Sequence, residues 1–490
     1  MIKYIISNIK HLKFLLKIRL LTYIFILISF ASCSNLVQVD PPYTSINKDN
    51  VFNNDLTATA AITYIYTVLS SYNQSPNVNS VSTLYFFGGL LADELNLFDR
   101  SQPNYNIFYT NALNANSIDA GVWNISYSMI LSANLAIEQL NSNQLLTKSV
   151  QQQLLGEAKF MRAFFYFYLV NLYGDVPLAI SSDPLVNSIL GREDVDKIYS
   201  QMVADLSDAE DLLSDDFRSG KVNVSSSQRV RPSRWAAKAL LSRIYLYHKD
   251  YSLAEQLATE VINQSSLFQL DSLDEVFLIS SKESIWQLQN INNTQGNTGE
   301  GNLFILPTGG PNSSGYPVYL SHHVVESFED GDQRKSHWTD TVMDDSANVF
   351  YYANKYKSGV LTSPGQNIEY ETVLRLAEQY LIRAEARVQL NRLTEGESDL
   401  NIIRKRAGLV NLNGLTKESL IEAILHERQV ELFTEWGHRW LDLKRMGKIN
   451  EVMTSVTAEK GGTWSANWAY WPIAQSELIA DHNLVQNVGY

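Results

Sequence analysis

The sequence predicts a mainly α-helical protein in which irregular tetratricopeptide-like helix pairs form a scaffold and a loop-rich insertion contains short strands. Three observations support this fold class. Apolar residues recur at helical spacing in several long segments, and two segments carry the packing positions of helix–turn–helix repeats. The stretch 265–368, between those two segments, lacks this periodicity. A helical array can run to this length as one body, so residues 33–490 are predicted to form a single body.

The first 32 residues have the composition of a secretory signal peptide. They contain five basic residues and no acidic residue, and an apolar run from Leu20 to Phe30 leads into Ala31, Ser32 and Cys33. Such a run is short for a bilayer span. A cysteine directly after small residues is typical of bacterial lipoproteins, in which it carries the lipid, so Cys33 is the predicted lipid anchor. The alternative is an ordinary signal peptide with a chance cysteine.

Net charge and cysteine usage restrict the possible partners. The chain has 39 Lys and Arg and 52 Asp and Glu, and removal of the five basic signal residues leaves 34 basic against 52 acidic residues, a net charge of −18. This excess of negative charge argues against nucleic acid, anionic lipid headgroups and polyanionic substrates. Because Cys33 is the single cysteine, disulfides and cysteine-ligated zinc sites are excluded.

The N-terminal part, residues 33–264, begins with a polar tether through Asp40 and two prolines and continues as helices. Helices are predicted over residues 55–71, 121–141 and 154–173. The first is expected to pack through the stripe Leu56, Ala60, Tyr64 and Val68. The third carries the aromatic stripe Phe160, Phe164 and Phe167, which we interpret as a core face rather than a ligand cleft because its spacing suits helix packing.

Two segments resemble tetratricopeptide helix pairs. The first covers residues 235–248 and 251–264, with Ser233 as the expected N-cap. The second runs over residues 369–407 and places Ala384 and Gly396 in the small-residue slots. It belongs to a C-terminal part, residues 369–490, in which a further helix over 420–446 is expected to kink at Gly437.

The insertion, residues 265–368, differs in kind from the helical parts. Residues 284–289 and 350–356 are predicted strands, and residues 290–315 between them are rich in Asn, Gly, Thr and Ser and are predicted to be a loop. A loop of this length in a compact protein is often functional. Residues 85–109 form a second loop-rich aromatic stretch and are the other predicted ligand loop.

No catalytic motif is present in the sequence, which lacks a Gly-rich phosphate loop, a GxSxG elbow and an HExxH helix. The strongest metal-like cluster is His322 and His323 beside Glu326, Asp330 and Asp332. On a strand, adjacent histidines would point to opposite faces, so no metal site and no cofactor are predicted.

Aromatic and amide side chains in the two loop regions form the predicted ligand-binding surface. Aromatic faces stack on sugar rings or on peptide side chains, and Asn, Gln and Arg hydrogen-bond with hydroxyl groups. The alternative for each ring is that it packs its own loop against the helices. The candidate ligand-binding residues are Phe98, Arg100, Gln102, Tyr105, Phe304, Tyr316, Tyr319 and Trp338.

A set of motifs spans the mature chain in order. Besides Cys33, these motifs are 156–163, 173–178, 231–240, 376–386, 427–432, 439–443, 471–473 and 483–490. Taken together, they resemble the SusD/RagB family of nutrient-binding outer-membrane lipoproteins of Bacteroidetes. One departure is the segment Ser34–Gln38, which lacks the acidic residues that often follow the lipid cysteine in surface-exposed members.

The resemblance implies a function without catalysis. The protein would bind an oligo- or polysaccharide at the cell surface, held to the outer membrane by its lipid and facing the exterior, and deliver it to a SusC-like TonB-dependent transporter. Peptide capture, as in the RagB branch, is the alternative, and a lipid-anchored hydrolase is a third hypothesis. Because ligand-binding positions differ between family members, the resemblance assigns no site residue.

Overall fold

The computed structural model describes residues 50–70, 81–118, 121–290, 298–359 and 368–490, together with Phe14, Leu16, Lys17 and Arg19. Residues 52–490 form one unit by their internal contacts, and residues 1–51 form another. The predicted lipid anchor Cys33 and its tether lie outside the described residues. Within the described ranges, no helix combines the length and the apolar character needed to cross a membrane.

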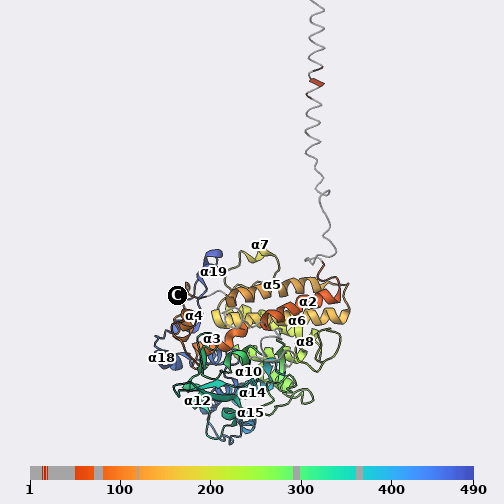
Figure 1. Ribbon diagram of the computed structural model, residues 1–490. Coiled ribbons are helices and arrows are strands. Elements are labelled where there is room, and N and C mark those ends of the chain that lie inside the picture. Colours follow the sequence, from red (N-terminus) through yellow and green to blue (C-terminus); the bar gives the residue numbers. More distant parts are fainter. Residues whose placement is uncertain are drawn as a thin grey trace, which may run out of the picture. The chain divides into compact units, whose positions relative to one another are not determined.

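Long helices form the N-terminal part. The predicted helices are α2 (Asp55–Ser70), α5 (Gly121–Asn141) and α6 (Lys148–Tyr173), which begins six residues earlier than expected. Figure 1 shows the three lying side by side, and each of them contacts the other two. The aromatic stripe of α6 is buried as predicted: Phe160, Phe164 and Phe167 are almost inaccessible to solvent.

The buried face of α2 is not the one predicted. Leu56 and Tyr64, which were expected to face the core, are 79% and 54% exposed. Instead Ala58, Ile62 and Ile65 are buried. A second apolar stripe runs along the same helix, offset from the first, and packing against α5 and α6 selects that stripe.

The helix pairs stack into one continuous array. Contacts run from α6 to α8 (Val195–Leu212), then to α9 (Arg234–Tyr247) and α10 (Tyr251–Ile262), and from α10 to α14 (Leu376–Gln389). Helix α14 then packs on α15 (Leu393–Arg406) and α16 (Lys417–Leu432). The insertion therefore leaves the array after α10, and the chain returns to stack directly on α10. This confirms the predicted fold class.

Small residues at the predicted positions allow the pairs to approach closely. A Cβ atom on Gly396 would lie 2.5 Å from the Val388 side chain and 2.8 Å from the carbonyl oxygen of Ala384, so α15 can contact α14 only with glycine there. Ser233 occupies the N-cap position of α9 as expected, but its side chain makes no capping hydrogen bond. The capping contacts come from its backbone carbonyl, which accepts from Ala236 and Ala237.

Three small antiparallel sheets, each of two strands, lie in the described residues. Strand β1 (Leu95–Leu97) pairs with β3 (Val318–Leu320), β2 (Ser284–Leu288) with β6 (Glu371–Arg375), and β4 (Thr339–Met343) with β5 (Val349–Ala353). The predicted strands at 284–289 and 350–356 are confirmed within a few residues.

Three sequence predictions need correction here. Residues 371–375, expected to start a helix, form β6 because they pair with β2. The stretch 85–109 is largely regular, since α3 (Leu84–Leu91), β1 and α4 (Pro103–Tyr109) occupy most of it. The predicted loop 290–315 contains α11 (Gly299–Phe304), whose Thr298 side chain accepts a hydrogen bond from the Gly301 amide. Asn- and Gly-rich composition favoured loop in the sequence, but a capped helical turn fits the same residues.

Short helices complete the unit and connect its parts. Gly437, at the predicted kink, has a φ of +72° and separates α16 from α17 (His438–Arg445). A Cβ on Gly88 would lie 2.9 Å from the Gly437 Cα, so α3 and this corner touch through backbone. The remaining helices are α7 (Pro184–Asn187), α12 (His322–Ser327), α13 (Gln333–Trp338), α18 (Ile449–Glu459) and α19 (Gln475–Ala480), with 3₁₀ turns η2 (Val81–Thr83) and η3 (Ala466–Ala469).

Aromatic rings from the insertion and from the C-terminal part complete the core around α6. Trp286 of β2 contacts Phe160 and Phe164 edge-on, with ring centroids 5.1 and 5.4 Å apart. Trp436, at the corner before α17, contacts Phe164 at 5.8 Å. Edge-to-face geometry adds to the burial of apolar area. The insertion is thus anchored to the helical array through its own core residues.

A buried network of ion pairs lies between the insertion and the C-terminal helices. Arg375 pairs with Glu283 at 2.9 Å, Glu431 at 2.6 Å and Glu435 at 2.8 Å. Lys355 reaches Glu435 at 2.5 Å and donates to the carbonyl oxygens of Glu431 and Phe433. All of these charged side chains are almost fully buried. Buried charges are tolerated only when they are paired in this way.

Two buried carboxyl groups near this network lack full pairing. Burial raises the pKa of Glu371 from 4.5 to about 8, and burial followed by repulsion from Glu371 raises the pKa of Glu300 well above its ordinary value. The Oε1 atom of each group has no hydrogen-bond partner. Between pH 4.5 and 8 the unfolded chain therefore releases a proton that the folded chain retains, so stability falls as pH rises through this window.

We expect Glu371→Gln to stabilise the protein at alkaline pH. Glutamine keeps the shape of the side chain and cannot ionise. The free energy of unfolding of the variant should therefore exceed that of wild type by about 2–4 kcal/mol at pH 8 and by little near pH 4.5. Urea denaturation at pH 4.5, 6, 7 and 8 measures this difference. The exposed Glu326→Gln is the matched control and should leave the profile unchanged. Glu94 also has a pKa of about 8 because of burial, so the substitution should remove only part of the dependence of the unfolding free energy on pH. An unchanged pH dependence in Glu371→Gln would contradict the prediction.

Candidate functional site

Pairing of β1 with β3 brings the two predicted ligand regions together. Leu95 lies opposite Leu320, and Asn96 opposite Tyr319. Just beyond the strand, the Phe98 amide donates to the carbonyl oxygen of Pro317 at 2.8 Å. More than two hundred residues separate these segments along the chain. Their side chains nevertheless share one surface because the ladder is antiparallel and in register.

An aromatic surface forms where this sheet meets β5. Phe350 of β5 lies between two predicted ligand rings, with its centroid 6.2 Å from Phe98 and 5.1 Å from Tyr319. Phe98 is 46% exposed, and Tyr319 and Phe350 are half-buried. A ring that keeps part of its face open can stack on a ligand while its edge stays packed on the protein. We call Phe98, Tyr319 and Phe350 the aromatic surface.

Polar side chains border the aromatic surface. Arg100 is exposed, and its guanidinium lies 5.1 Å from the centroid of the Tyr109 ring and donates to the Tyr109 hydroxyl at 3.5 Å. Gln102 donates from Nε2 to the carbonyl oxygen of Ser313 at 2.9 Å, which ties α4 to the insertion. Arg100 thus presents donors to solvent beside the rings, whereas one donor of Gln102 is used in positioning the loop.

Tyr105 and Tyr316 occupy intermediate positions. Tyr105 of α4 is half-buried because its ring packs edge-on against Phe86, with centroids 5.1 Å apart. Tyr316 is half-buried in a turn in which its carbonyl oxygen accepts from the Asn312 amide at 2.9 Å. Both remain candidates for ligand contact.

Two predicted ligand residues belong to the core, which corrects the sequence interpretation. Trp338 is fully buried: its indole nitrogen donates to the carbonyl oxygen of Leu273 at 2.8 Å, and the Lys355 ammonium lies 5.0 Å from its ring centroid. Phe304 is 3% exposed and packs edge-on against Tyr85. Neither ring can stack on a ligand from solvent. The composition of a loop could not reveal that α11 and α13 turn these rings inward.

Phe350 is the member of the aromatic surface that the sequence did not single out. It was assigned only to a strand, and alternation along that strand did not predict its neighbours. Its ring packs closely on Gly310, where a Cβ would lie 3.1 Å from the Phe350 ring and φ is +87°. Proximity in space, rather than any local pattern, identifies it.

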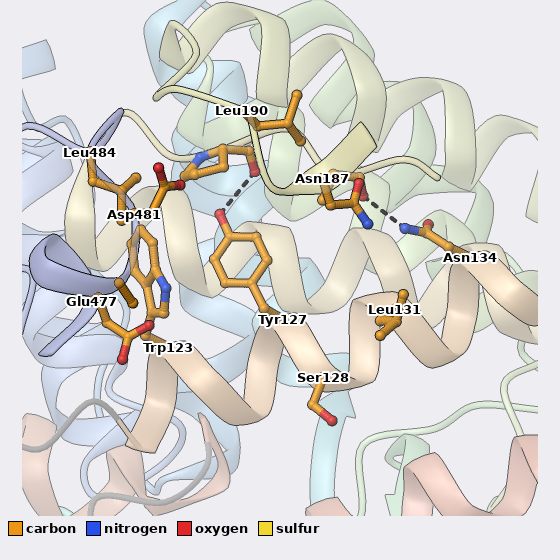
Figure 2. Close-up of a pocket in the computed structure, with 13 residues that line it drawn as sticks. Trp123, Tyr127, Ser128, Leu131, Asn134, Asn187, Leu190, Glu477, Asp481 and Leu484 are labelled. Carbon is orange, nitrogen blue, oxygen red and sulfur yellow. Dashed lines mark hydrogen bonds between the residues drawn. The ribbon is translucent and has the colours of Figure 1, made fainter. Parts of the chain in front are cut away.

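A separate pocket lies between α5, the segment around α7 and the C-terminal tail (Figure 2). Its volume is about 410 Å³. In the close-up, Trp123 and Tyr127 of α5 face Glu477 and Asp481, which come from α19 and its end. The full lining is Trp123, Tyr127, Ser128, Leu131, Asn134, Pro177, Ala179, Asn187, Leu190, Glu477, Ala480, Asp481 and Leu484.

The pocket combines a rigid aromatic wall with an acidic rim. The Tyr127 hydroxyl donates to the carbonyl oxygen of Pro177 at 2.8 Å, and burial raises its pKa well above the ordinary value. Asn134 donates to the carbonyl oxygen of Ala179 at 2.9 Å. These bonds fix the walls, while the carboxylates of Glu477 and Asp481 give the rim negative charge. An apolar group that carries a cation fits such a pocket.

The histidine cluster is arranged differently from the sequence expectation. His322 and His323 begin α12 instead of lying on a strand, and their ring centroids are 4.0 Å apart. Glu459 of α18 is their neighbour. Asp332 is not part of this cluster, because its carboxylate pairs with Arg334 at 2.8 Å.

Comparison with known proteins places this architecture in a family. Residues 45–246 match a family model described as starch-binding and associating with the outer membrane, and residues 339–490 match the model of the SusD family. The chain belongs to the SusD/RagB family. The two models together cover more than half of the chain and include most of the helical array and the C-terminal motifs.

Individual relatives agree with this assignment. SusD-like protein P25 of Formosa agariphila is 25% identical, over 89% of this chain and 91% of that protein. A laminarin binding SusD-like protein of known structure is 24% identical with a TM-score of 0.73, covering 88% of this chain and 99% of that one. Surface glycan-binding protein A from Bacteroides uniformis has a TM-score of 0.70 at 22% identity, covering 88% and 98%. The SusD-like fold of this chain is therefore shared along nearly its whole length.

Proposed function

We propose that this SusD-like protein binds a glycan at the aromatic surface, without catalysis. The observation that carries this proposal is the convergence of Phe98, Tyr319 and Phe350, which come from three segments and remain partly open. Rings placed side by side suit the apolar C–H faces of successive sugars, and Arg100 beside them supplies donors for hydroxyl groups. Structural neighbours that are named as a laminarin binding protein and a surface glycan-binding protein support this choice of ligand class.

Delivery to a transporter is the second part of the proposal. The protein would sit on the outer membrane by a lipid on Cys33, face the exterior, and pass the glycan to a TonB-dependent transporter. The family model that associates these proteins with the outer membrane supports this location. A lasting complex should bury more than about 2,000 Å². Joint recovery of the two proteins from membranes in mild detergent tests this step.

Peptide capture is the second candidate, and the pocket in Figure 2 favours it. Its aromatic wall and its acidic rim of Glu477 and Asp481 suit a basic side chain or an amino terminus better than a neutral sugar. If this candidate is correct, the double variant Glu477→Gln, Asp481→Asn should weaken peptide binding, and the aromatic surface should be dispensable.

Removal of a ring from the aromatic surface should weaken glycan binding. We expect Phe98→Ala and Phe350→Ala each to cost about 1–3 kcal/mol, a roughly five- to hundredfold loss of affinity. Calorimetric titration of the mature protein with a panel of soluble polysaccharides, laminarin among them, measures this loss. The melting temperature of Phe98→Ala should change little, because 46% of that side chain is already exposed.

Tyr64→Ala is the matched control, since Tyr64 is a comparably exposed ring on α2, outside the aromatic surface. Its affinity should equal that of wild type. Unchanged affinity in both Phe98→Ala and Phe350→Ala would place the glycan site elsewhere. Equal losses in all three variants would show that the effect is not specific to the aromatic surface.

A further inference from the structure

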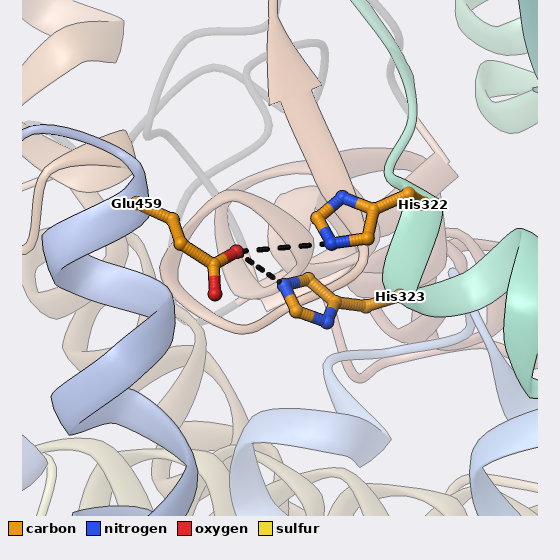
Figure 3. Close-up of side chains that lie close together, drawn as sticks. All are labelled: His322, His323 and Glu459. Atoms are coloured by element: carbon orange, nitrogen blue, oxygen red, sulfur yellow. Dashed lines mark hydrogen bonds and ion pairs between the residues drawn. The ribbon is translucent and has the colours of Figure 1, made fainter.

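Two adjacent histidines and a distant glutamate converge on one point. His322 and His323 are the first residues of α12, where the Ser321 side chain accepts a hydrogen bond from the Val324 amide and fixes the helix start. Both rings direct Nε2 toward the carboxylate of Glu459, at the end of α18 (Figure 3). The Oε2 atom of Glu459 lies 2.9 Å from Nε2 of His323 and 3.8 Å from Nε2 of His322.

These separations match those between ligands of one metal ion. One ligand atom from each of the three side chains lies within 4.8 Å of the other two. With metal–ligand distances of about 2.0–2.2 Å, tetrahedral geometry places neighbouring ligand atoms about 3.4 Å apart. Small side-chain rotations would therefore let all three bind one ion. We propose that His322, His323 and Glu459 form a binding site for a zinc-class divalent transition ion.

The donor set selects the class of metal. Imidazole nitrogens suit Zn²⁺, Ni²⁺ and Cu²⁺, whereas Ca²⁺ and Mg²⁺ prefer oxygen ligands. His322 and Glu459 are 57% and 48% exposed and His323 is 27% exposed, so water can reach the site and complete the coordination. The nearest cationic side chain along the chain, Lys460, is turned inward: its ammonium donates to the carbonyl oxygens of Leu90 and Ala92. It therefore does not occupy the place of the ion.

A simple ion pair between histidine and glutamate is the rival explanation. It requires only one ring, whereas here the same ring atom of two histidines points at one carboxylate oxygen. His248 shows the contrast. It also contacts two carboxylates, Asp250 at 2.8 Å and Asp196 at 3.3 Å, but through different ring nitrogens, so the two contacts cannot share one ion.

Bound metal would connect two elements that hold the segment before β1. Ser321, next to the histidines, donates its amide to the carbonyl oxygen of Glu94 at 2.9 Å. Lys460, next to Glu459, holds the carbonyl oxygen of Leu90 at 2.7 Å. An ion bridging α12 and α18 would therefore fix residues 90–94 from both sides. The expected consequence is a higher melting temperature rather than a new reaction.

Zinc titration of the mature protein, purified without a histidine tag, tests the site. We expect one Zn²⁺ to bind per chain by calorimetry and the melting temperature to rise by about 3 °C at a free zinc concentration one hundred times the dissociation constant. Mg²⁺ at the same concentration should have no effect. The double variant His322→Ala, His323→Ala and the single variant Glu459→Gln should both lose the bound ion and the thermal shift.

His248→Ala is the matched control, because it removes an ion-paired surface histidine outside the proposed site. It should bind zinc as wild type does. Each variant's melting temperature without metal shows whether it folds, and its zinc-dependent shift is read relative to that value. Retention of the shift in the double variant, or no zinc binding by wild type, would overturn the proposal and leave the ion pair as the role of these residues.

Discussion

Replacement of Cys33 with alanine is expected to remove the protein from the outer membrane. Cys33 is the only cysteine and directly follows the apolar run and Ala31-Ser32. Without its thiol no lipid can be attached, and two or more acyl chains are what make such anchoring stable. We therefore expect the variant either in the soluble fraction or as an uncleaved precursor. Fractionation of cells, with detection of the protein by immunoblot, measures the change.

Ser34→Ala is the control, because it alters the neighbouring residue without removing the thiol. It should fractionate with the outer membrane as wild type does. A Cys33→Ala protein that is processed normally and still fractionates with the outer membrane would contradict lipid anchoring. Binding of polysaccharide by the released protein should be unchanged, since the aromatic surface belongs to the unit formed by residues 52–490.

Substitution of Arg375 by methionine should cause the largest loss of stability. Its guanidinium pairs with Glu283, Glu431 and Glu435 and also donates to the Glu431 carbonyl oxygen at 2.8 Å. Methionine fills similar space but leaves these carboxylates with fewer partners in a region closed to water. Breaking a buried ion pair from one side costs about 3–5 kcal/mol. Denaturant unfolding at pH 7 measures the change.

Arg392→Met provides the comparison, since Arg392 pairs with Glu255 at 2.7 Å on the surface, where 42% of its side chain is exposed. Exposed ion pairs contribute about 0–1 kcal/mol to stability, so the free energy of unfolding of this variant should stay close to that of wild type. Similar losses for the two variants would mean that burial does not set the strength of these pairs. If Arg375→Met has the same free energy of unfolding as wild type, Arg406 and Lys355, which share the same carboxylates, replace Arg375 fully.

The charged residues of the family motifs acquire a role only in the folded protein. In the sequence these motifs carry the family resemblance, and no role was assigned to their charged residues. In the structure Glu157 pairs with Arg231 at 2.6 Å, and Arg428 pairs with Asp442 at 2.7 Å, both buried. Each pair joins two motifs that are distant or separated by a turn. Burial of a charge depends on elements that meet in space, which local periodicity does not encode.

The sequence by itself determined the helices and the family. Apolar spacing of 3.6 residues is a local property, so α5, α9 and α10 were predicted within a few residues. The start of α6 was placed six residues too late. Gly437 marked the break before α17. Small residues such as Gly396 also marked close helix contacts correctly, because only the absence of a side chain permits them.

The tertiary structure decided which side chains can meet a ligand or a metal. Trp338 and Phe98 both lie in aromatic-rich stretches, yet packing buries the first and leaves the second open. Pairing of β1 with β3 created the aromatic surface, and contact with β5 added Phe350. Glu459 lies beside His322 and His323, although it follows His323 by 136 positions in the sequence. Exposure and convergence depend on contacts between distant segments, and for that physical reason one sequence could not reveal them.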